Sequence, residues 1–219
     1  MSTITIDTPD GPAELIIDEA EEPAAVLLLG HGAGGDVDAW DLALLADRLP
    51  TLGVNVARFR QPYRVAGRKV FSSAPALDRA WQMAVAEATR RWPGLPLFVG
   101  GRSAGARTAC RGFGSGQTGL VLLAFPLHPP GKPDKSRLAE LVDAAAPTVI
   151  VQGEKDTFGA PDQVSAALAT AGRADVRVVA MPAAGHTLAP KAKATDEQIA
   201  EAERLLTWSV AAFIDAGRS

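Results

Sequence analysis

The chain has 219 residues, and its 22 basic and 25 acidic side chains give a formal net charge of −3. With 47% hydrophobic and 21% charged residues, this near-neutral balance is typical of a soluble globule and argues against nucleic-acid or membrane-surface binding. The length suits a single domain over 1–219. The longest apolar runs, about six residues, are far too short to span a bilayer.

The first predicted element is a β-hairpin, in which residues 3–7 and 13–18 flank a Pro-Asp-Gly-Pro turn. Apolar runs and helical patterns then alternate along the chain. The predicted strands are 24–30, 54–59, 96–101, 119–125, 147–153 and 175–181. The predicted helices are 38–53, 76–92, 103–113, 135–145, 161–172 and 196–216. This alternation predicts a mostly parallel sheet with an antiparallel N-terminal hairpin and helices on both faces.

Three single residues have predicted places in this arrangement. Trp81 and Trp208 fall on apolar helix faces and are expected in the core. Cys110 is expected to be buried packing, and as the single cysteine it cannot form an intramolecular disulfide. The absence of a disulfide, together with an N-terminus that does not resemble a signal peptide, predicts a cytoplasmic protein.

A glycine-rich turn follows the strand 24–30. Residues 30–35, Gly-His-Gly-Ala-Gly-Gly, fit the Gly-x-Gly-x-x-Gly pattern of a dinucleotide-binding turn. The same string fits a His-Gly-x-Gly loop, with which some hydrolases hold an oxyanion. The rest of the chain has to decide between these two interpretations.

A second motif lies between the strand 96–101 and the helix 103–113. Gly101-Arg-Ser-Ala-Gly105 is a Gly-x-Ser-x-Gly sequence, which places a serine on a sharp turn with little bulk beside it. The amides at the start of the following helix favour negative charge there. Ser103 is therefore a candidate nucleophile, and the alternative is a serine that only caps the helix.

A serine nucleophile needs a base and an acid, which on such a fold follow it in the order acid, then histidine. His186 lies in the loop after the last strand and is the candidate base. His128 also follows the serine, but no strand that could carry the acid lies between Ser103 and His128. The acid should follow the strand 147–153. Asp156 is favoured there over Glu154, whose neighbour is a lysine.

The hydrolase interpretation explains more residues than the dinucleotide one. It gives Ala104, together with Ala33 or Gly34, the task of donating backbone N–H groups to an oxyanion. A dinucleotide site calls for an acidic residue about 20 positions after the glycines, and the strand 54–59 ends without one. Arg58 and Arg60 could still serve a 2′-phosphate, so an NADP-type binder stays an alternative.

The assembled pattern resembles the α/β-hydrolase superfamily. It is most similar to the small dienelactone-hydrolase-like branch that includes testis-expressed protein 30 and NSL complex subunit 3. The strings that carry this resemblance are GHGAGG (30–35), GGRSAGAR (100–107), AFPLHPPGKP (124–133), VQGEKDTFG (151–159) and AGHTL (184–188). The resemblance implies an α/β-hydrolase fold with no or minimal cap and the Ser-Asp-His roles. Some relatives resemble scaffolds, so a catalytically silent binding protein is a further alternative.

Substrate contacts are expected from His31, Arg102, Tyr63 and His128, and a structural role is the favoured alternative for His128. Arg102 and the basic loop 58–69 offer charge for an acidic substrate group, or else form a solvated surface. The sequence thus predicts a serine hydrolase for a small ester or thioester, without cofactor or metal. A homodimer or a protein partner is compatible with it.

Overall fold

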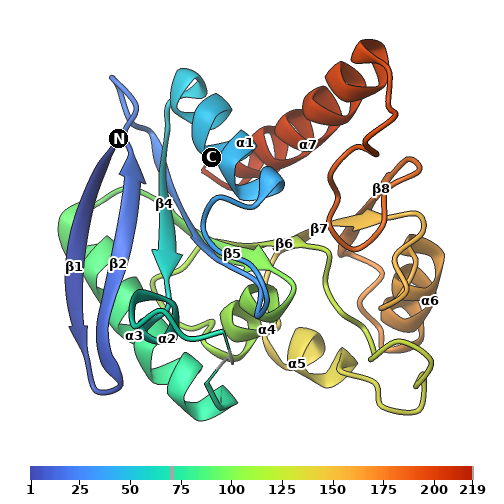
Figure 1. Ribbon diagram of the computed structural model, residues 1–219, viewed down its shortest axis with the longest axis horizontal. Helices are drawn as coiled ribbons and strands as arrows, with labels where there is room; N and C mark the ends of the chain where they lie inside the picture. The colour runs from blue at the N-terminus through green and yellow to red at the C-terminus, as the bar shows by residue number, and fades with distance from the viewer. Residues whose placement is uncertain (70–71, 219) are drawn as a thin grey trace.

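The computed structural model describes residues 1–69 and 72–218, so Val70 and Phe71 of the predicted loop after the strand 54–59 lie outside it. A single eight-stranded sheet has the order β1-β2-β4-β3-β5-β6-β7-β8 (Figure 1). Its strands are β1 (Ser2–Thr8), β2 (Gly11–Asp18), β3 (Ala25–Gly30), β4 (Val54–Arg60), β5 (Leu97–Arg102), β6 (Gly119–Leu123), β7 (Thr148–Gly153) and β8 (Arg177–Met181). The β1–β2 and β2–β4 pairs are antiparallel and the later pairs parallel, which confirms the predicted sheet.

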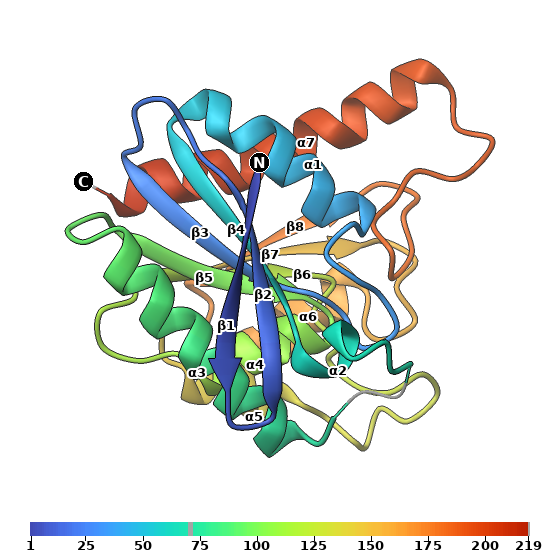
Figure 2. The same cartoon turned by 60° about the vertical axis from the view of Figure 1, so that its left-hand side comes forward.

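Helices cover both faces of the sheet (Figure 2). They are α1 (Trp40–Arg48), η1 (Leu49–Leu52), α2 (Pro62–Val65), α3 (Ala74–Arg91), α4 (Ala104–Arg111), α5 (Leu138–Asp143), α6 (Pro161–Thr170) and α7 (Asp196–Gly217). Side chains of α1 and α7 pack into one apolar cluster, and those of α3, α4, α5 and α6 into the other. Because helices pack on both faces, β3 is buried along its whole length, as expected of a central parallel strand.

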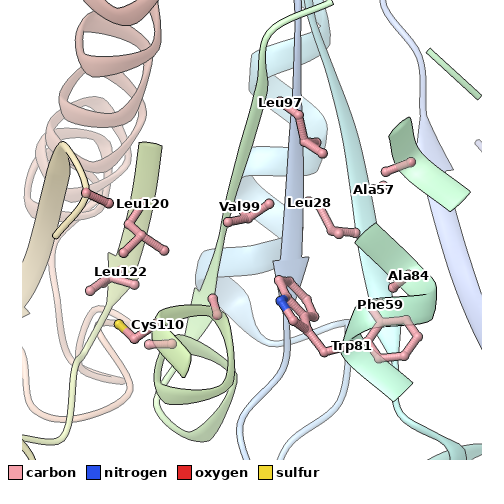
Figure 3. Packing of buried hydrophobic residues seen from close by; sticks show 14 of the residues in the cluster. Leu28, Ala57, Phe59, Trp81, Ala84, Leu97, Val99, Cys110, Leu120 and Leu122 are labelled. Carbon is pink, nitrogen blue, oxygen red and sulfur yellow. The ribbon is translucent and has the colours of Figure 1, made fainter. Parts of the chain in front are cut away.

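Trp81 anchors the cluster beneath α3 and α4 (Figure 3). Its side chain is fully buried and meets Phe59 edge to face, with the ring centroids 6.0 Å apart. Cys110 is also buried in this cluster, as predicted. Burial raises the pKa of the Cys110 thiol to about 12, so it is an inert packing residue.

Two predictions about the helices are wrong. The predicted helix 38–53 ends at Arg48 and continues as the 3₁₀ turn η1, since Pro50 has no N–H to donate to the preceding α-helical turn. Trp208 is 59% exposed, because the helical period puts Leu206, Val210 and Ile214 on the buried face and turns Trp208 away from it. Over the residues that the model describes, no helix is both long and apolar enough to cross a membrane.

The parallel strands bring distant loops to one edge of the sheet. Gly30 at the end of β3 pairs with Gly101 near the end of β5, and Gly153 at the end of β7 pairs with Met181 at the end of β8. The loops that follow these four strands therefore emerge side by side. They carry the glycine motif 30–35, Ser103, Asp156 and His186.

Candidate active site

Ser103 stands on a strained turn between β5 and α4. Its backbone has φ 53° and ψ −109°, a conformation that a residue with a side chain rarely adopts. The Ser103 N–H donates to the Leu123 carbonyl at 2.9 Å, which ties the turn to β6. Backbone strain of this kind persists only where the surrounding structure enforces it, and it is concentrated at functional sites.

The two glycines of the motif are required by the approach of β3. A Cβ at Gly101 would lie 2.4 Å from the Gly30 carbonyl oxygen, and one at Gly105 would lie 2.3 Å from the same atom. Both distances are far inside van der Waals contact with backbone that cannot easily move. The Gly-x-Ser-x-Gly sequence therefore has glycines at both ends because the turn and α4 pack tightly against β3.

His186 joins Ser103 to Asp156. Its Nε2 lies 2.8 Å from Ser103 Oγ, and its Nδ1 lies 2.8 Å from Asp156 Oδ2. Because an ionised carboxylate can only accept, Nδ1 carries the proton and Nε2 is left to accept from the serine hydroxyl. Phe158 stacks on the imidazole with the ring centroids 4.1 Å apart, which holds the plane of the base.

Asp156 is buried and has hydrogen-bond donors at both oxygens. Oδ1 accepts from the Phe158 N–H at 2.8 Å, and Oδ2 accepts from Gln152 Nε2 at 3.0 Å as well as from His186. The alternative acid, Glu154, instead accepts from the Ala183 N–H at 2.8 Å and does not contact the imidazole. The structure thus brings Asp156 to the base, in the predicted order along the chain.

Gln152 and Phe158 are site residues that the sequence analysis missed. Gln152 is fully buried at the end of β7, where its Nε2 also lies 2.7 Å from the Gly159 carbonyl and 3.2 Å from the Phe125 carbonyl. It therefore holds the carboxylate and the loop around it. A polar residue inside the apolar run of β7 was the available signal for a buried hydrogen-bonding role.

The glycine loop 30–35 passes beside the serine. A Cβ at Gly32 would lie 3.5 Å from Ser103 Cβ, whereas one at Gly34 would meet no atom within 4 Å. Tyr63 Oη donates to the Ala33 carbonyl at 3.0 Å and so fixes this part of the loop. On the other side of the serine, Ala104 begins α4, and the first N–H groups of a helix have no partner within it.

His31 and Tyr63 support the glycine loop. His31 Nε2 accepts from the Gln61 N–H at 3.1 Å, and its Nδ1 donates to the Gly32 carbonyl at 2.8 Å, so both ring nitrogens are engaged inside the protein. Burial lowers the pKa of His31 and keeps it neutral. Both residues were expected to contact substrate. The contacts of His31, and the hydrogen bond from the Tyr63 hydroxyl to Ala33, instead give them a role in supporting the glycine loop.

His128 lies next to the stacking phenylalanine. The backbone N–H of His128 donates to the Phe158 carbonyl at 3.0 Å, and the ring Nδ1 lies 3.0 Å from the Pro129 carbonyl. These contacts fit a structural role for His128: the backbone bond joins the loop after β6 to the loop that carries Asp156, and the ring contact stays within the loop after β6.

Arginines expected to bind anionic groups form ion pairs within the protein. Arg58 pairs with Asp18 at 2.9 Å, and Arg60 contacts Glu14 at 2.6 Å and Asp36 at 2.8 Å. These pairs remove the two cations on which the NADP-type alternative depended. Arg102 is also largely buried, and its Nη2 donates to the His186 carbonyl at 3.1 Å.

A cavity of about 700 Å³ lies away from the serine. The loop after β8 and the first half of α7 form its walls, with Met181, Leu188 and Leu205 among the apolar side chains that line it. None of Ser103, Asp156 and His186 lines this cavity. It is therefore separate from the hydrogen-bonded line that joins the serine to the carboxylate.

Comparison with known proteins agrees with the fold. Residues 23–215 match the family described as alpha/beta hydrolase domain. Among solved structures, an alpha-beta serine hydrolase homologue from Coxiella burnetii has a TM-score of 0.76 at 19% identity, covering 95% of this chain and 97% of its own. A serine hydrolase described as lacking a lid, from Xanthomonas campestris, has 0.71 at 20% identity and coverages of 97% and 94%.

A third solved structure, Est1E from Butyrivibrio proteoclasticus, has a TM-score of 0.72 at 14% identity, covering 98% of this chain and 100% of its own. At such identities the solved structures establish the fold, which is the predicted α/β-hydrolase fold. The finer resemblance to testis-expressed protein 30 and NSL complex subunit 3 stays a prediction. The match over most of the chain is to one family, and the chain belongs to that alpha/beta hydrolase domain family.

Proposed function

We propose that the chain is a serine hydrolase that cleaves a small ester or thioester through an acyl-enzyme on Ser103. The observation that carries the proposal is the hydrogen-bonded line from Ser103 through His186 to Asp156, in which both distances are 2.8 Å. The strained backbone of Ser103 supports it, because such strain costs free energy and is concentrated at functional sites. The donors around Asp156 support it because they hold a buried carboxylate against the imidazole.

In this proposal Ser103 Oγ attacks the carbonyl carbon while its proton passes to His186 Nε2. Asp156 holds the neutral imidazole in the correct tautomer and then stabilises the imidazolium. His186 returns the proton to the departing alcohol or thiol, leaving the acyl group on Ser103. A water molecule then releases the acid by the same steps, with His186 again as the base.

The Ala104 N–H and an N–H of the glycine loop, from Ala33 or Gly34, stabilise the oxyanion. Tyr63 binds the Ala33 carbonyl, and the planarity of the Ala33–Gly34 peptide then fixes the direction of the Gly34 N–H. The open space at Gly34 supports this assignment. Loss of one such donor typically lowers kcat about 10²- to 10³-fold.

The proposed substrate is small or extended, because we expect the site to have no or minimal cap. The likeness to a serine hydrolase without lid supports this part of the proposal. Est1E has also been solved with ferulic acid bound, an aromatic acid of the kind that an ester hydrolase releases. A screen should therefore contain short-chain p-nitrophenyl esters, short acyl thioesters and a hydroxycinnamate methyl ester.

Labelling with a fluorophosphonate probe tests the proposal. We expect the wild type to be labelled, and we expect Ser103→Ala and His186→Ala to lose the label. Ser165→Ala is the matched control, since this serine is exposed on α6 and its hydroxyl donates to the Pro161 carbonyl of the same helix. Absence of labelling in folded wild type contradicts the proposal and favours the silent binding protein. Labelling that survives Ser103→Ala contradicts it too, because the reactive group then lies elsewhere.

A further inference from the structure

Arg102 precedes the candidate nucleophile, yet its side chain turns inward. That side chain is only 11% exposed, and its Nε lies 3.1 Å from Oδ2 of Asp41, which is completely buried on α1. A buried guanidinium needs such a partner, since an unpaired charge in the interior is very costly. The ion pair therefore holds the guanidinium in one place beside the turn.

The guanidinium contacts three separate parts of the site. Nη2 donates to the His186 carbonyl at 3.1 Å, and Nε faces Asp41. Nη1 lies against the glycine loop, where a Cβ at Gly32 would be 3.4 Å from it and a Cβ at Gly35 would be 3.8 Å from it. One planar group thus meets α1, the loop that carries the base and the loop proposed to bind the oxyanion.

The loop 182–190, which carries His186, has no regular secondary structure of its own. The Lys155 N–H donates to the Ala184 carbonyl at 2.8 Å, and Glu154 accepts from the Ala183 N–H, so these two contacts secure the loop on the side of the acid. Arg102 secures it on the side of the nucleophile, by a hydrogen bond to the backbone of the base itself.

We propose that Arg102 is a positioning residue, which joins the His186 backbone to α1 and the glycine loop and so sets the distance between base and nucleophile. A general base works only within hydrogen-bond reach of the proton that it takes. Displacement of about 1 Å lowers rates about 10²-fold. The role rests on the proposed hydrolase function and differs from the substrate contact expected from the sequence, because the group is engaged inside the protein.

The chemistry of arginine suits this role better than that of lysine. Its guanidinium is a flat, rigid fork that donates in several fixed directions, whereas an ammonium is a point charge on a flexible stem. A lysine at this position could pair with Asp41 but would not reach the His186 carbonyl at the same time. Arg102→Lys should therefore keep the charge and still lose the positioning.

The experiment compares Arg102→Met and Arg102→Lys with wild type. Arg111→Met is the matched control, since the Arg111 side chain is also largely buried and ion-paired, to Asp78 at 2.6 Å, but at the far end of α4. Steady-state kinetics with a neutral and an anionic ester of equal chain length separate the two roles. For both Arg102 variants we expect kcat to fall about ten- to hundredfold on both esters, with KM nearly unchanged.

A loss confined to the anionic ester, seen as a higher KM, would overturn the positioning role in favour of substrate binding. Full activity in Arg102→Lys would overturn it too, because charge alone would then be sufficient. Amide hydrogen exchange supplies a readout that does not need activity. We expect faster exchange in 182–190 in both Arg102 variants and unchanged exchange there in Arg111→Met.

The exchange measurement also separates this proposal from the proposed function. If the wild type proves inert towards the fluorophosphonate probe, the hydrolase function fails, but faster local exchange would still show that Arg102 holds the base loop. If the wild type is labelled and exchange in 182–190 is the same in Arg102→Met as in wild type, the positioning role is refuted and the hydrolase function stands.

Discussion

Replacing Asp156 by asparagine is the sharpest single perturbation of the site. Both carboxylate oxygens accept in the wild type, Oδ1 from the Phe158 N–H and Oδ2 from Gln152 and His186. An asparagine has one oxygen and one NH₂ group. The NH₂ group, which is itself a donor, must therefore replace one of the two oxygens and face that oxygen's hydrogen-bond donor. The substitution keeps the size of the side chain and changes only its hydrogen-bonding capacity.

Two magnitudes follow from this mismatch. A buried donor left without an acceptor costs about 1–3 kcal/mol of stability. The catalytic effect is larger, because His186 loses both the group that sets its tautomer and the charge that stabilises the imidazolium. For an acid in this position of a triad the loss in kcat is about 10⁴-fold.

The assay is kcat on a short-chain p-nitrophenyl ester, with denaturant unfolding measured in parallel. Glu154→Gln is the control, since Glu154 is an exposed carboxylate two positions away and glutamine can still accept from the Ala183 N–H. We expect it to retain activity. A loss below tenfold in Asp156→Asn, or an equal loss in Glu154→Gln, would refute the assignment of Asp156 as the acid.

Three further predictions concern stability. Burial raises the pKa of Asp41 from 3.8 to about 6, so the native state holds this proton more tightly than the unfolded state does. As the pH rises from 4 to 7, the unfolding free energy of wild type should therefore fall by up to about 3 kcal/mol relative to that of Asp41→Asn. Parallel pH curves for the two proteins would contradict this. Gly105→Ala should cost at least about 1–3 kcal/mol or prevent folding, because its Cβ would lie 2.3 Å from the Gly30 carbonyl oxygen, and a wild-type melting temperature would refute that. Trp81→Ala should cost about 3–5 kcal/mol, and Trp208→Ala no more than about 0.5, in the same denaturant titration; similar costs would contradict the burial assigned to the two rings.

The sequence was sufficient to place the main groups of the site because the fold orders them. Continuous apolar runs predict parallel strands, and parallel strands put their following loops at one edge, so Ser103, Asp156 and His186 could be expected together. The sequence also favoured Asp156 over Glu154, although both acids follow the same strand, and the structure puts Asp156 beside the imidazole. The distances between the groups required the structure.

The partners of buried polar residues could not be predicted in the same way. Arg102 beside a nucleophile suggests an anionic substrate, and nothing in the pattern indicates that Asp41 of a distant helix would pair with it. Gln152 and His31 depend likewise on loops that fold around them. Hydrophobic periodicity predicts which face of a helix is buried, but a hydrogen bond between two remote positions leaves no period in the sequence.

In the proposed mechanism, Ser103 is an activated nucleophile. Rapid quenching of the enzyme with a slowly turned-over p-nitrophenyl ester, followed by intact-mass and peptide mass spectrometry, tests it most directly. We expect one acyl adduct, located on the peptide that contains Ser103, absent from Ser103→Ala and formed far more slowly in His186→Ala. Ester turnover with the adduct on another residue, or with the same rate in Ser103→Ala, would contradict it.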